Sequence, residues 1–312
     1  MKHELSRRLF LKYSAAAGSV IGSSLLSGLT GLRLLEAHAA PASALAVAKS
    51  QDYFKNTIKA VDLLGGMGRF VPRQAKVGLL VNNPFTNIGA HVNPDVTLAL
   101  VKMCFEAGAK GVVSLKNEPR NYWSRSGLLK TYSAELNALK ANSGEYPERS
   151  VPGGVSLKKA EVIKDLFEVD VFINVSIAKD HDGVKYSGLL KNMMGAATFS
   201  TCRYFHSGAI VSGYYSDVPF LSQCIADINL LRRPDLCVLD ATQFISENGP
   251  YGPGRLIKAH KVVAGTDPVL MDAYGCTLLG LDPRSIIMLS KSAKAGLGRM
   301  DLTAADIQEI EI

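Results

Sequence analysis

Short apolar runs that alternate with helical patterns constrain the fold of this chain more than any other feature. The runs have the length and β-branched content of buried strands, and they are Val77–Val81, Val112–Leu115, Val169–Val175, Leu236–Asp240 and Lys261–Ala264. Strands that alternate with helices form mostly parallel sheets with helices on both faces. The sequence therefore predicts an α/β fold with three layers, α/β/α, in a single large domain with a long loop insertion at 116–156.

Helix-start signals support this pattern. Asn93-Pro94 supplies an N-cap and then a proline at the first helical position before Asp95–Ala107, and Asp267-Pro268 does the same before a helix through Leu279. The other helical patterns are Asp52–Leu64, Ser133–Lys140, Val155–Phe167, Val218–Leu231, with Pro219 early in it, and Pro283–Ala295.

The first residues carry a targeting pattern. Ser6–Lys12 follows the twin-arginine export pattern S-R-R-x-F-L-K, and Ala37-His38-Ala39 has the form of a cleavage site. The apolar stretch between them is interrupted by Gly and Ser, and it lacks the run of about 18 apolar residues that a membrane span needs. We expect the twin-arginine translocation machinery as a partner, an exported, periplasmic or otherwise extracytoplasmic location, and no stable membrane span after cleavage. Retention of the segment as an anchor is the alternative.

This pattern sets the expected organisation: a signal peptide at 1–39, an N-terminal lead-in at 40–75 and the α/β domain at 76–312. The twin-arginine machinery exports folded proteins, and many of its cargoes carry a cofactor. The sequence does not identify a cofactor here.

Composition excludes some partners and sites. The chain has 35 Lys and Arg against 28 Asp and Glu, and removal of 1–39 leaves 30 against 26. This mixed, mildly basic balance without long runs of one charge argues against binding to nucleic acid. The five cysteines are scattered without C-x-x-C spacing, which argues against a disulfide framework or a local metal cluster. Cys104, Cys237 and Cys276 have the surroundings of buried apolar residues, whereas Cys202, beside Arg203, is the candidate for a lowered pKa.

The stretch 170–195 is the candidate site. The apolar run that ends near Val175 is followed by a polar loop with Lys179, Asp180, His181, Asp182 and Lys185, and then by an apolar segment with Lys191 and Asn192. Ligands of open α/β sheets bind at the carboxyl ends of strands, which is where this loop belongs.

These motifs resemble the "domain of unknown function 362" family over roughly 76–300. The matching segments are NPDVTLALVKMCFEAGAKGVV, DVFINVSIAKDHDGVKYSGLLKNMMG, NGPYGPG, GTDPVLMDAYGCTLLGLDP and GLG. Family members usually have K-T-H followed by K-N-x-M-G, so the resemblance implies functional positions at Lys179, His181, Lys191, Asn192 and Gly195, with Asp180 in place of the Thr.

The chain also departs from the family pattern. Members commonly have a Lys-Pro-Asn-like motif after the first strand, where this chain has Asn82-Asn83-Pro84 and so lacks that lysine. Some relatives carry a ferredoxin-type cluster domain, for which this chain has no cysteine run. The resemblance implies the fold and cofactor-dependent or redox-linked chemistry, but no particular reaction.

The leading hypothesis for the site is an anion pocket. Lys179, Lys185 and Lys191 would supply charge, and three amides would supply neutral donors: Asn82, Asn83 and Asn192. Helix amides would add to the attraction if a helix begins near Ser187. The alternative is a set of solvated lysines on a surface loop.

His181, Lys179 and Asp180 are the candidate catalytic residues. An imidazole with a near-neutral pKa can transfer protons, and Asp180 or Asp182 would orient it, although a lone loop histidine is more often a hydrogen-bonding residue. A metal site from Asp180, His181 and Asp182, with His206, Asp240 or Glu247, is disfavoured because adjacent residues on an extended loop point in different directions.

Two further features complete the predicted site. Gly249, Gly252 and Gly254 would let a loop backbone approach a ligand closely. Asp272 falls within an apolar helix, where a buried carboxylate needs a partner, and we expect that partner to be a lysine of the pocket.

The sequence favours an exported protein that binds an anionic small molecule, as an enzyme or in redox-linked chemistry. The alternative is a non-catalytic binding or accessory protein for an extracytoplasmic redox or metal system. A domain that has lost its activity is a third hypothesis, because the first-strand lysine is missing.

Overall fold

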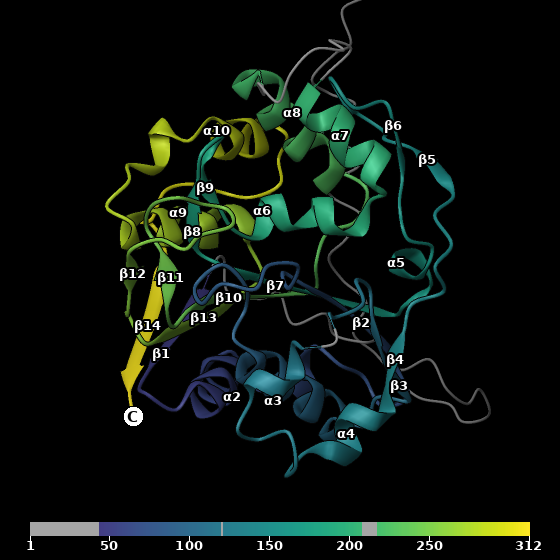
Figure 1. Cartoon of the computed structure of the whole chain (residues 1–312), viewed down its shortest axis with the longest axis vertical. Coiled ribbons are helices and arrows are strands. Elements are labelled where there is room, and N and C mark those ends of the chain that lie inside the picture. Colours follow the sequence, from purple (N-terminus) through teal and green to yellow (C-terminus); the bar gives the residue numbers. More distant parts are fainter. Residues whose placement is uncertain (1–43, 120, 208–216) are drawn as a thin grey trace, which may run out of the picture. The chain divides into compact units, whose positions relative to one another are not determined.

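The computed structural model describes residues 44–119, 121–207 and 217–312, so the predicted signal peptide lies outside the described residues. Within them the main sheet has eight strands in the order β14-β1-β13-β10-β7-β2-β3-β4 (Figure 1). These strands are β1 (Ala44–Lys49), β2 (Lys76–Val81), β3 (Gly111–Ser114), β4 (Leu139–Ala141), β7 (Val171–Ile177), β10 (Leu236–Ala241), β13 (Lys261–Gly265) and β14 (Asp306–Glu311).

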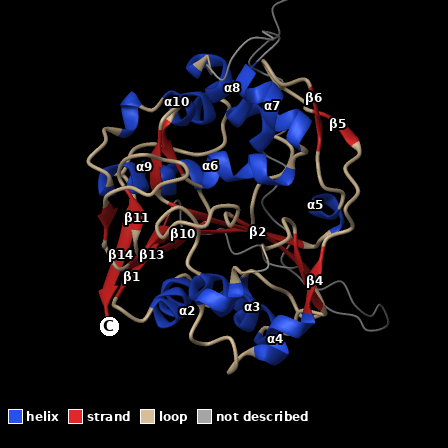
Figure 2. Cartoon of the chain, viewed as in Figure 1, coloured by secondary structure: helices blue, strands red, loops and turns tan. Residues whose placement is uncertain are grey.

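Helices cover both faces of this sheet, which confirms the predicted three-layer α/β fold (Figure 2). On one face lie α2 (Tyr53–Leu63), α3 (Pro94–Glu106) and α4 (Ser133–Ala138). The other face carries α6 (Leu189–Asn192), α7 (Phe199–Ser207), α8 (Val218–Asn229), α9 (Pro268–Leu278) and α10 (Ile287–Lys294). The sheet is mostly parallel, as predicted: only β13 runs antiparallel to its neighbours, β1 and β10.

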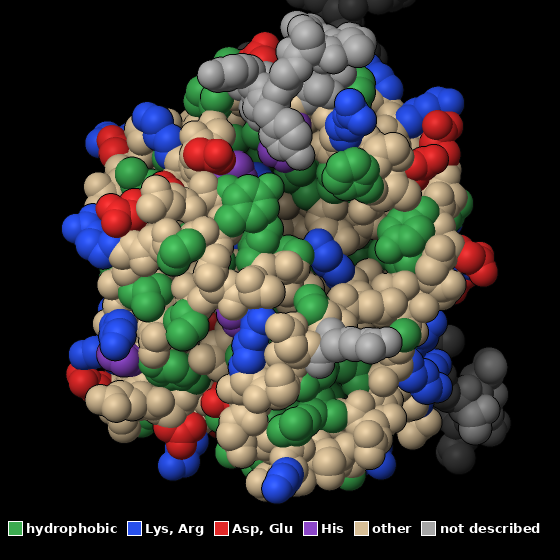
Figure 3. Space-filling model, viewed as in Figure 1, with side chains coloured by type: hydrophobic (Ala, Val, Ile, Leu, Met, Phe, Trp, Pro, Cys, Tyr) green, Lys and Arg blue, Asp and Glu red, His purple; other side chains and the backbone are tan. Residues whose placement is uncertain are grey.

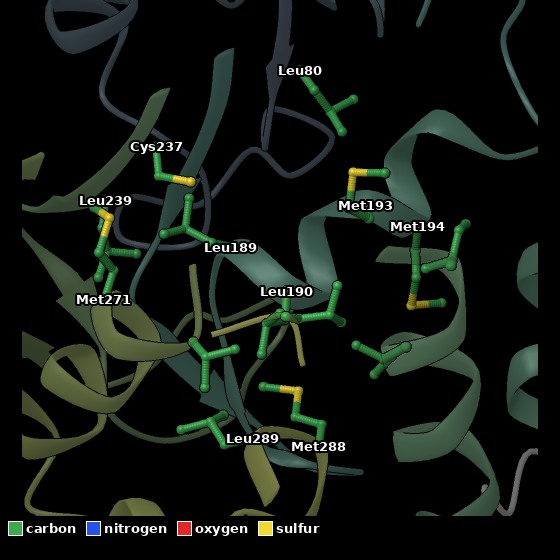
Figure 4. Packing of buried hydrophobic residues seen from close by; sticks show 14 of the residues in the cluster. Leu80, Leu189, Leu190, Met193, Met194, Cys237, Leu239, Met271, Met288 and Leu289 are labelled. Carbon is green, nitrogen blue, oxygen red and sulfur yellow. The ribbon is translucent and has the colours of Figure 1, made fainter. Parts of the chain in front are cut away.

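The central strand β7 is buried on both faces, because helices cover both. Ile173 and Val175 point into the apolar cluster beneath α2 and α3, and Phe172 points into the cluster beneath α6 to α10. Figure 4 shows the second cluster, in which Leu190 on α6 lies near Met288 on α10. A helix of one turn such as α6 owes its place to this packing rather than to intrinsic propensity.

The order of the strands reverses at the centre of the sheet. From β2 the chain crosses to β3 on one side through α3, whereas from β7 it crosses to β10 on the other side through α6, α7 and α8. In open α/β sheets a crevice forms outside the carboxyl ends of the strands at such a reversal. The fold therefore places a crevice where β2 and β7 end.

Some elements differ from the sequence prediction. The lead-in contributes β1 to the main sheet, and the chain ends in β14, which was not predicted. The helix predicted over Val155–Phe167 is wrong, because that segment contains strand β6 (Lys159–Glu161) and only a single helical turn, α5 (Asp165–Glu168). The Asp227 carboxylate accepts the backbone N–H groups of residues 155–157, which holds them in a turn instead of a helix.

Short elements complete the fold. The insertion at 116–156 contains the 3-10 helix η2 (Trp123–Arg125), α4, β4 and β5 (Glu148–Ser150), which pairs with β6. The remaining short elements are β8 (Lys179–His181), β9 (Lys185–Ser187), β11 (Phe244–Ile245), β12 (Leu256–Ile257), η1 (Met67–Arg69), η3 (Met193–Ala196) and η4 (Pro283–Ser285). Among the described residues, no helix has both the length and the apolar character that crossing a membrane requires.

Candidate functional site

A cavity of about 120 Å³ lies at the carboxyl ends of three adjacent parallel strands, β7, β2 and β3. Three lysines line it: Lys179 just after β7, Lys116 just after β3, and Lys191 on α6. The other side chains around it include Asn82, Phe85, Ser187, Asn192, Cys202 and Pro250. On the face shown in Figure 3, Lys or Arg side chains lie beside hydrophobic ones around a hollow near the centre.

Lys179 is fully buried and its amine is fully engaged. Its Nζ donates to the backbone oxygens of Ala90 and Pro250, at 2.5 and 3.3 Å, and to Asn82 Oδ1 at 3.4 Å. The amine also lies 4.2 Å from the centre of the Phe85 ring. An ammonium group has three N–H donors, so this one has none left for a ligand. Burial lowers the pKa of Lys179 well below its usual value, and the nearby Lys191 and Lys116 lower it further.

Lys116 and Lys191 differ from Lys179 in having free amines. Neither amine has a hydrogen-bond or ion-pair partner among the residues that the structure describes. Burial lowers the pKa of Lys191 to about 8; Cys202 and Asp182 act against this shift, and Lys116 adds to it. Burial also lowers the pKa of Lys116. Both side chains can therefore donate to a ligand in the cavity.

Sequence analysis missed Lys116 and expected Lys185 instead. Lys185 is exposed at the start of β9 and does not line the cavity. Lys116 follows the buried run that forms β3, and β3 pairs in parallel with β2. The rule that singled out Lys179, a polar residue after a buried parallel strand, applies equally to Lys116.

His181 is buried but is not a near-neutral proton carrier. The Gly183 N–H donates to its Nδ1 at 3.0 Å, and Asp182 Oδ1 lies 3.1 Å from the same nitrogen. Burial lowers the pKa of His181 to about 2, and Lys191, His206 and Lys179 contribute in that order. The expectation of a near-neutral pKa is therefore wrong, because burial among cations disfavours the imidazolium form. His181 does not line the cavity, and at neutral pH it is an uncharged ring next to it.

The asparagines mainly hold the site together. Asn192 Nδ2 donates to the backbone oxygens of Leu80 on β2 and Val175 on β7 and to Asn174 Oδ1, and its Oδ1 accepts from Asn82. These bonds fix the ends of β2 and β7 to α6. They also use the side-chain N–H groups of Asn82 and Asn192, which were predicted to donate to a ligand. Asn83 is buried, donates to the Lys116 backbone oxygen at 3.4 Å, and does not line the cavity.

Asp180 also has a structural role. Its Oδ2 accepts the Gly249 N–H at 2.9 Å, which joins the β8–β9 hairpin to the loop that carries Pro250. A Cβ on Gly249 would lie 1.9 Å from the Asp180 backbone oxygen, so only glycine allows this approach.

The other loop glycines likewise face protein atoms rather than the cavity. A Cβ on Gly254 would lie 2.0 Å from the Glu247 backbone oxygen, and Gly252 has a φ of +67°. Neither these two glycines nor Gly249 lines the cavity.

Asp272 has partners other than the expected lysine. Its Oδ1 accepts the Leu189 N–H at 2.7 Å and the Tyr186 hydroxyl at 3.3 Å, and its Oδ2 accepts the Leu190 N–H at 2.9 Å. Burial raises the pKa of Asp272 to about 7. The carboxyl group thus accepts the first amides of α6. The prediction that these amides would bind an anion is therefore wrong.

The remaining polar candidates have separate roles. Burial raises the pKa of Cys202, against the pull of Lys116 and Lys191, so the predicted lowered pKa is wrong. Asp240 accepts the Asn93 N–H and two hydrogen bonds from Thr242, away from His181. Among the described residues, no three His, Cys, Asp or Glu side chains gather closely enough to hold a metal ion.

Comparisons with known proteins give one family and a distant likeness to solved structures. The model of a family described as "Domain of unknown function (DUF362)" matches residues 76–277. The lactate racemase apoprotein from Thermoanaerobacterium thermosaccharolyticum is similar at 12% identity and a TM-score of 0.40, over 69% of this chain and 53% of that one. A protein of known structure from Thermotoga maritima is similar at 12% identity and a TM-score of 0.38, over 79% and 60%. The chain thus spans between about half and three fifths of these structures, and no curated protein matches.

Proposed function

This chain belongs to the DUF362 family, and we propose that it binds a small carboxylate- or phosphate-bearing molecule in the cavity lined by Lys116, Lys179 and Lys191. One observation carries the proposal: three lysine amines surround a single cavity, and none has a carboxylate within 4 Å among the described residues. Buried charges in folded proteins are normally paired, because an unpaired charge loses its hydration without compensation. An anionic ligand supplies the missing counter-charge.

The three lysines would divide the work. Lys179 uses its N–H groups to hold the surrounding loops, so it shapes the cavity and forms no hydrogen bond to the ligand. Lys116 and Lys191 have free donors and form charge-assisted hydrogen bonds to the ligand. Phe85 and Pro250 give the cavity an apolar side that suits the carbon atoms of an organic acid.

The size of the cavity limits the ligand. A cavity of about 150 Å³ is known to hold benzene, which has six non-hydrogen atoms. The cavity here, at about 120 Å³, therefore suits a ligand of similar or smaller size. Inorganic phosphate and short organic acids are of this size.

If the protein is an enzyme, Lys191 is the group that exchanges a proton near neutral pH. Its pKa of about 8 lies close to physiological pH, whereas that of His181 lies near 2. His181 would instead contribute an uncharged ring beside Lys191. We place this activity outside the cytoplasm on the strength of the Ser6–Lys12 pattern.

Calorimetric titration of the full chain with phosphate, acetate and lactate tests the proposal. Lys116→Met and Lys191→Met should each weaken binding about ten- to hundredfold, the loss of a charge-assisted hydrogen bond of about 1.5–3 kcal/mol. Lys185→Met, which removes an exposed lysine from the β8–β9 hairpin, is the matched control and should bind as the wild type does. Equal affinities in all four proteins, or no binding of any anion, would remove the proposal.

A further inference from the structure

We propose that Lys191 forms an imine with the carbonyl carbon of a small 2-oxo acid, while Lys116 binds the carboxylate of the same molecule. This inference rests on the proposed anion site and specifies its substrate class. It starts from the presence of two lysine amines, those of Lys116 and Lys191, in one cavity. Neither amine has a hydrogen-bond or ion-pair partner among the described residues.

Hydrogen bonding decides which of the three amines can react. An amine attacks a carbonyl with its lone pair, so it must be uncharged and not held in place as a donor of three hydrogen bonds. Lys179 is held in that way by Ala90, Pro250 and Asn82. Lys116 and Lys191 are not.

The surroundings of Lys191 favour it over Lys116. The uncharged rings of His181 and His206 both lie within electrostatic range of Lys191, as does the Asp182 carboxylate. The groups that act on Lys116 are Lys179, Lys191 and Cys202. Uncharged imidazole rings thus lie in the surroundings of Lys191, outside the lining of the cavity. The backbone of α6 is also fixed, through Asp272 and Asn192.

Lys191 also has a suitable proton affinity. With a pKa of about 8 instead of 10.5, the amine is uncharged about 300 times more often near neutral pH than an unperturbed lysine. Adjacent cationic groups and desolvation activate lysines for imine formation in this way.

The reaction balances without any co-reactant. The Lys191 nitrogen forms a bond to the carbonyl carbon, and the carbon–oxygen double bond breaks. The oxygen leaves as water with the two protons of the amine. The carboxylate of the acid stays paired with Lys116. The negative charge of this carboxylate also faces Lys179.

Reductive trapping tests the imine. The full chain is incubated with pyruvate and cyanoborohydride near pH 7.5, and the product is examined by intact mass and peptide mass spectrometry. We expect a single reduced adduct, on the peptide that contains Lys191, and a trapping rate that rises with pH and levels off above about pH 8. Lactate, which has a hydroxyl in place of the keto group, should slow the trapping by competition.

Variants separate this inference from the proposed function. Lys191→Met should abolish the adduct, Lys116→Met should slow its formation about tenfold or more and leave it on Lys191, and Lys185→Met should change nothing. Pyruvate that binds in calorimetry but gives no adduct, or adducts that are spread over exposed lysines, would overturn the imine and leave the anion site standing. Phosphate that binds where pyruvate and lactate do not would overturn the imine alone, and absence of binding by any of these anions would remove both.

Discussion

Lys179 and Lys191 have the same side chain, and their hydrogen bonds separate their roles. The amine of Lys179 holds the backbone oxygens of Ala90 and Pro250, whereas the amine of Lys191 meets no acceptor among the described residues. The first lysine therefore belongs to the framework of the site and the second to its chemistry. The sequence motif alone cannot assign these two roles. The acceptors that distinguish the lysines are backbone oxygens of loops that are distant in the sequence.

Asp272 gives a prediction at the same scale. Its pKa is about 7 in the folded chain against 3.8 when unperturbed, so between pH 4 and 7 the folded state retains a proton that the unfolded state has lost. By linkage, this group lowers the free energy of unfolding as pH rises through that window, and its effect is constant above pH 7. The loss is on the order of a few kcal/mol.

Urea denaturation of the wild type and of Asp272→Asn at several pH values measures this effect, because the variant cannot ionise there. We expect the wild type to lose stability relative to the variant from pH 4 to pH 7. A stability difference that stays constant over that range would contradict the assignment.

Among the elements, the loop after β11 has the clearest dependence on one residue. Gly249 lies against the Asp180 backbone on the β8–β9 hairpin, and the next residue, Pro250, accepts from Lys179. Gly249→Ala would force the loop away, because its Cβ would lie 1.9 Å from the Asp180 oxygen. We expect a loss of about 1–3 kcal/mol, typical of overpacking, and weaker anion binding.

Thermal unfolding and calorimetric titration check this prediction together. Gly127→Ala is the control, because a Cβ there meets nothing within 4 Å. If Gly249→Ala unfolds and binds anions like the wild type, the loop does not support the site.

The elements also show what the sequence could and could not predict. Buried runs such as Val77–Val81, and the Asn93 and Asp267 caps, have local signals, and the structure confirms them as β2, α3 and α9. Strand β14 has no such signal, because all of its residues are exposed and it forms only by pairing with β1. In the site, the rule of strand ends pointed to Lys179, which lines the cavity, but the partners of Asp272 and His181 depend on burial that only the assembled layers create.

At the scale of the whole molecule, export can be tested directly. The Ser6–Lys12 pattern predicts that the double substitution Arg7→Lys and Arg8→Lys blocks transport of the folded chain. Cell fractionation with an antibody to the mature domain should find the wild type outside the cytoplasm with a chain that begins at Ala40, and the variant inside. Equal distribution of both proteins would contradict the predicted signal.

Anion binding should also change the stability of the whole chain in a pH-dependent way. Lys191 has a pKa of about 8 when folded against 10.5 when unperturbed, so between these values the unfolded state binds more protons. Without an anion, the contribution of this group to the free energy of unfolding therefore rises as pH rises from 8 to 10.5. Below pH 8 the destabilising contribution of Lys191 has its full size. A bound anion favours the charged amine and removes that penalty.

Sulfate, whose charge is constant over this range, should raise the free energy of unfolding most at pH 8 and less at pH 10. A concentration 100 times the dissociation constant corresponds to about 2.7 kcal/mol. Thermal unfolding with and without sulfate measures the effect, and Lys191→Met controls for the general action of the salt. A stabilisation of equal size at both pH values, or in both proteins, would mean that sulfate acts on the chain elsewhere than at Lys191.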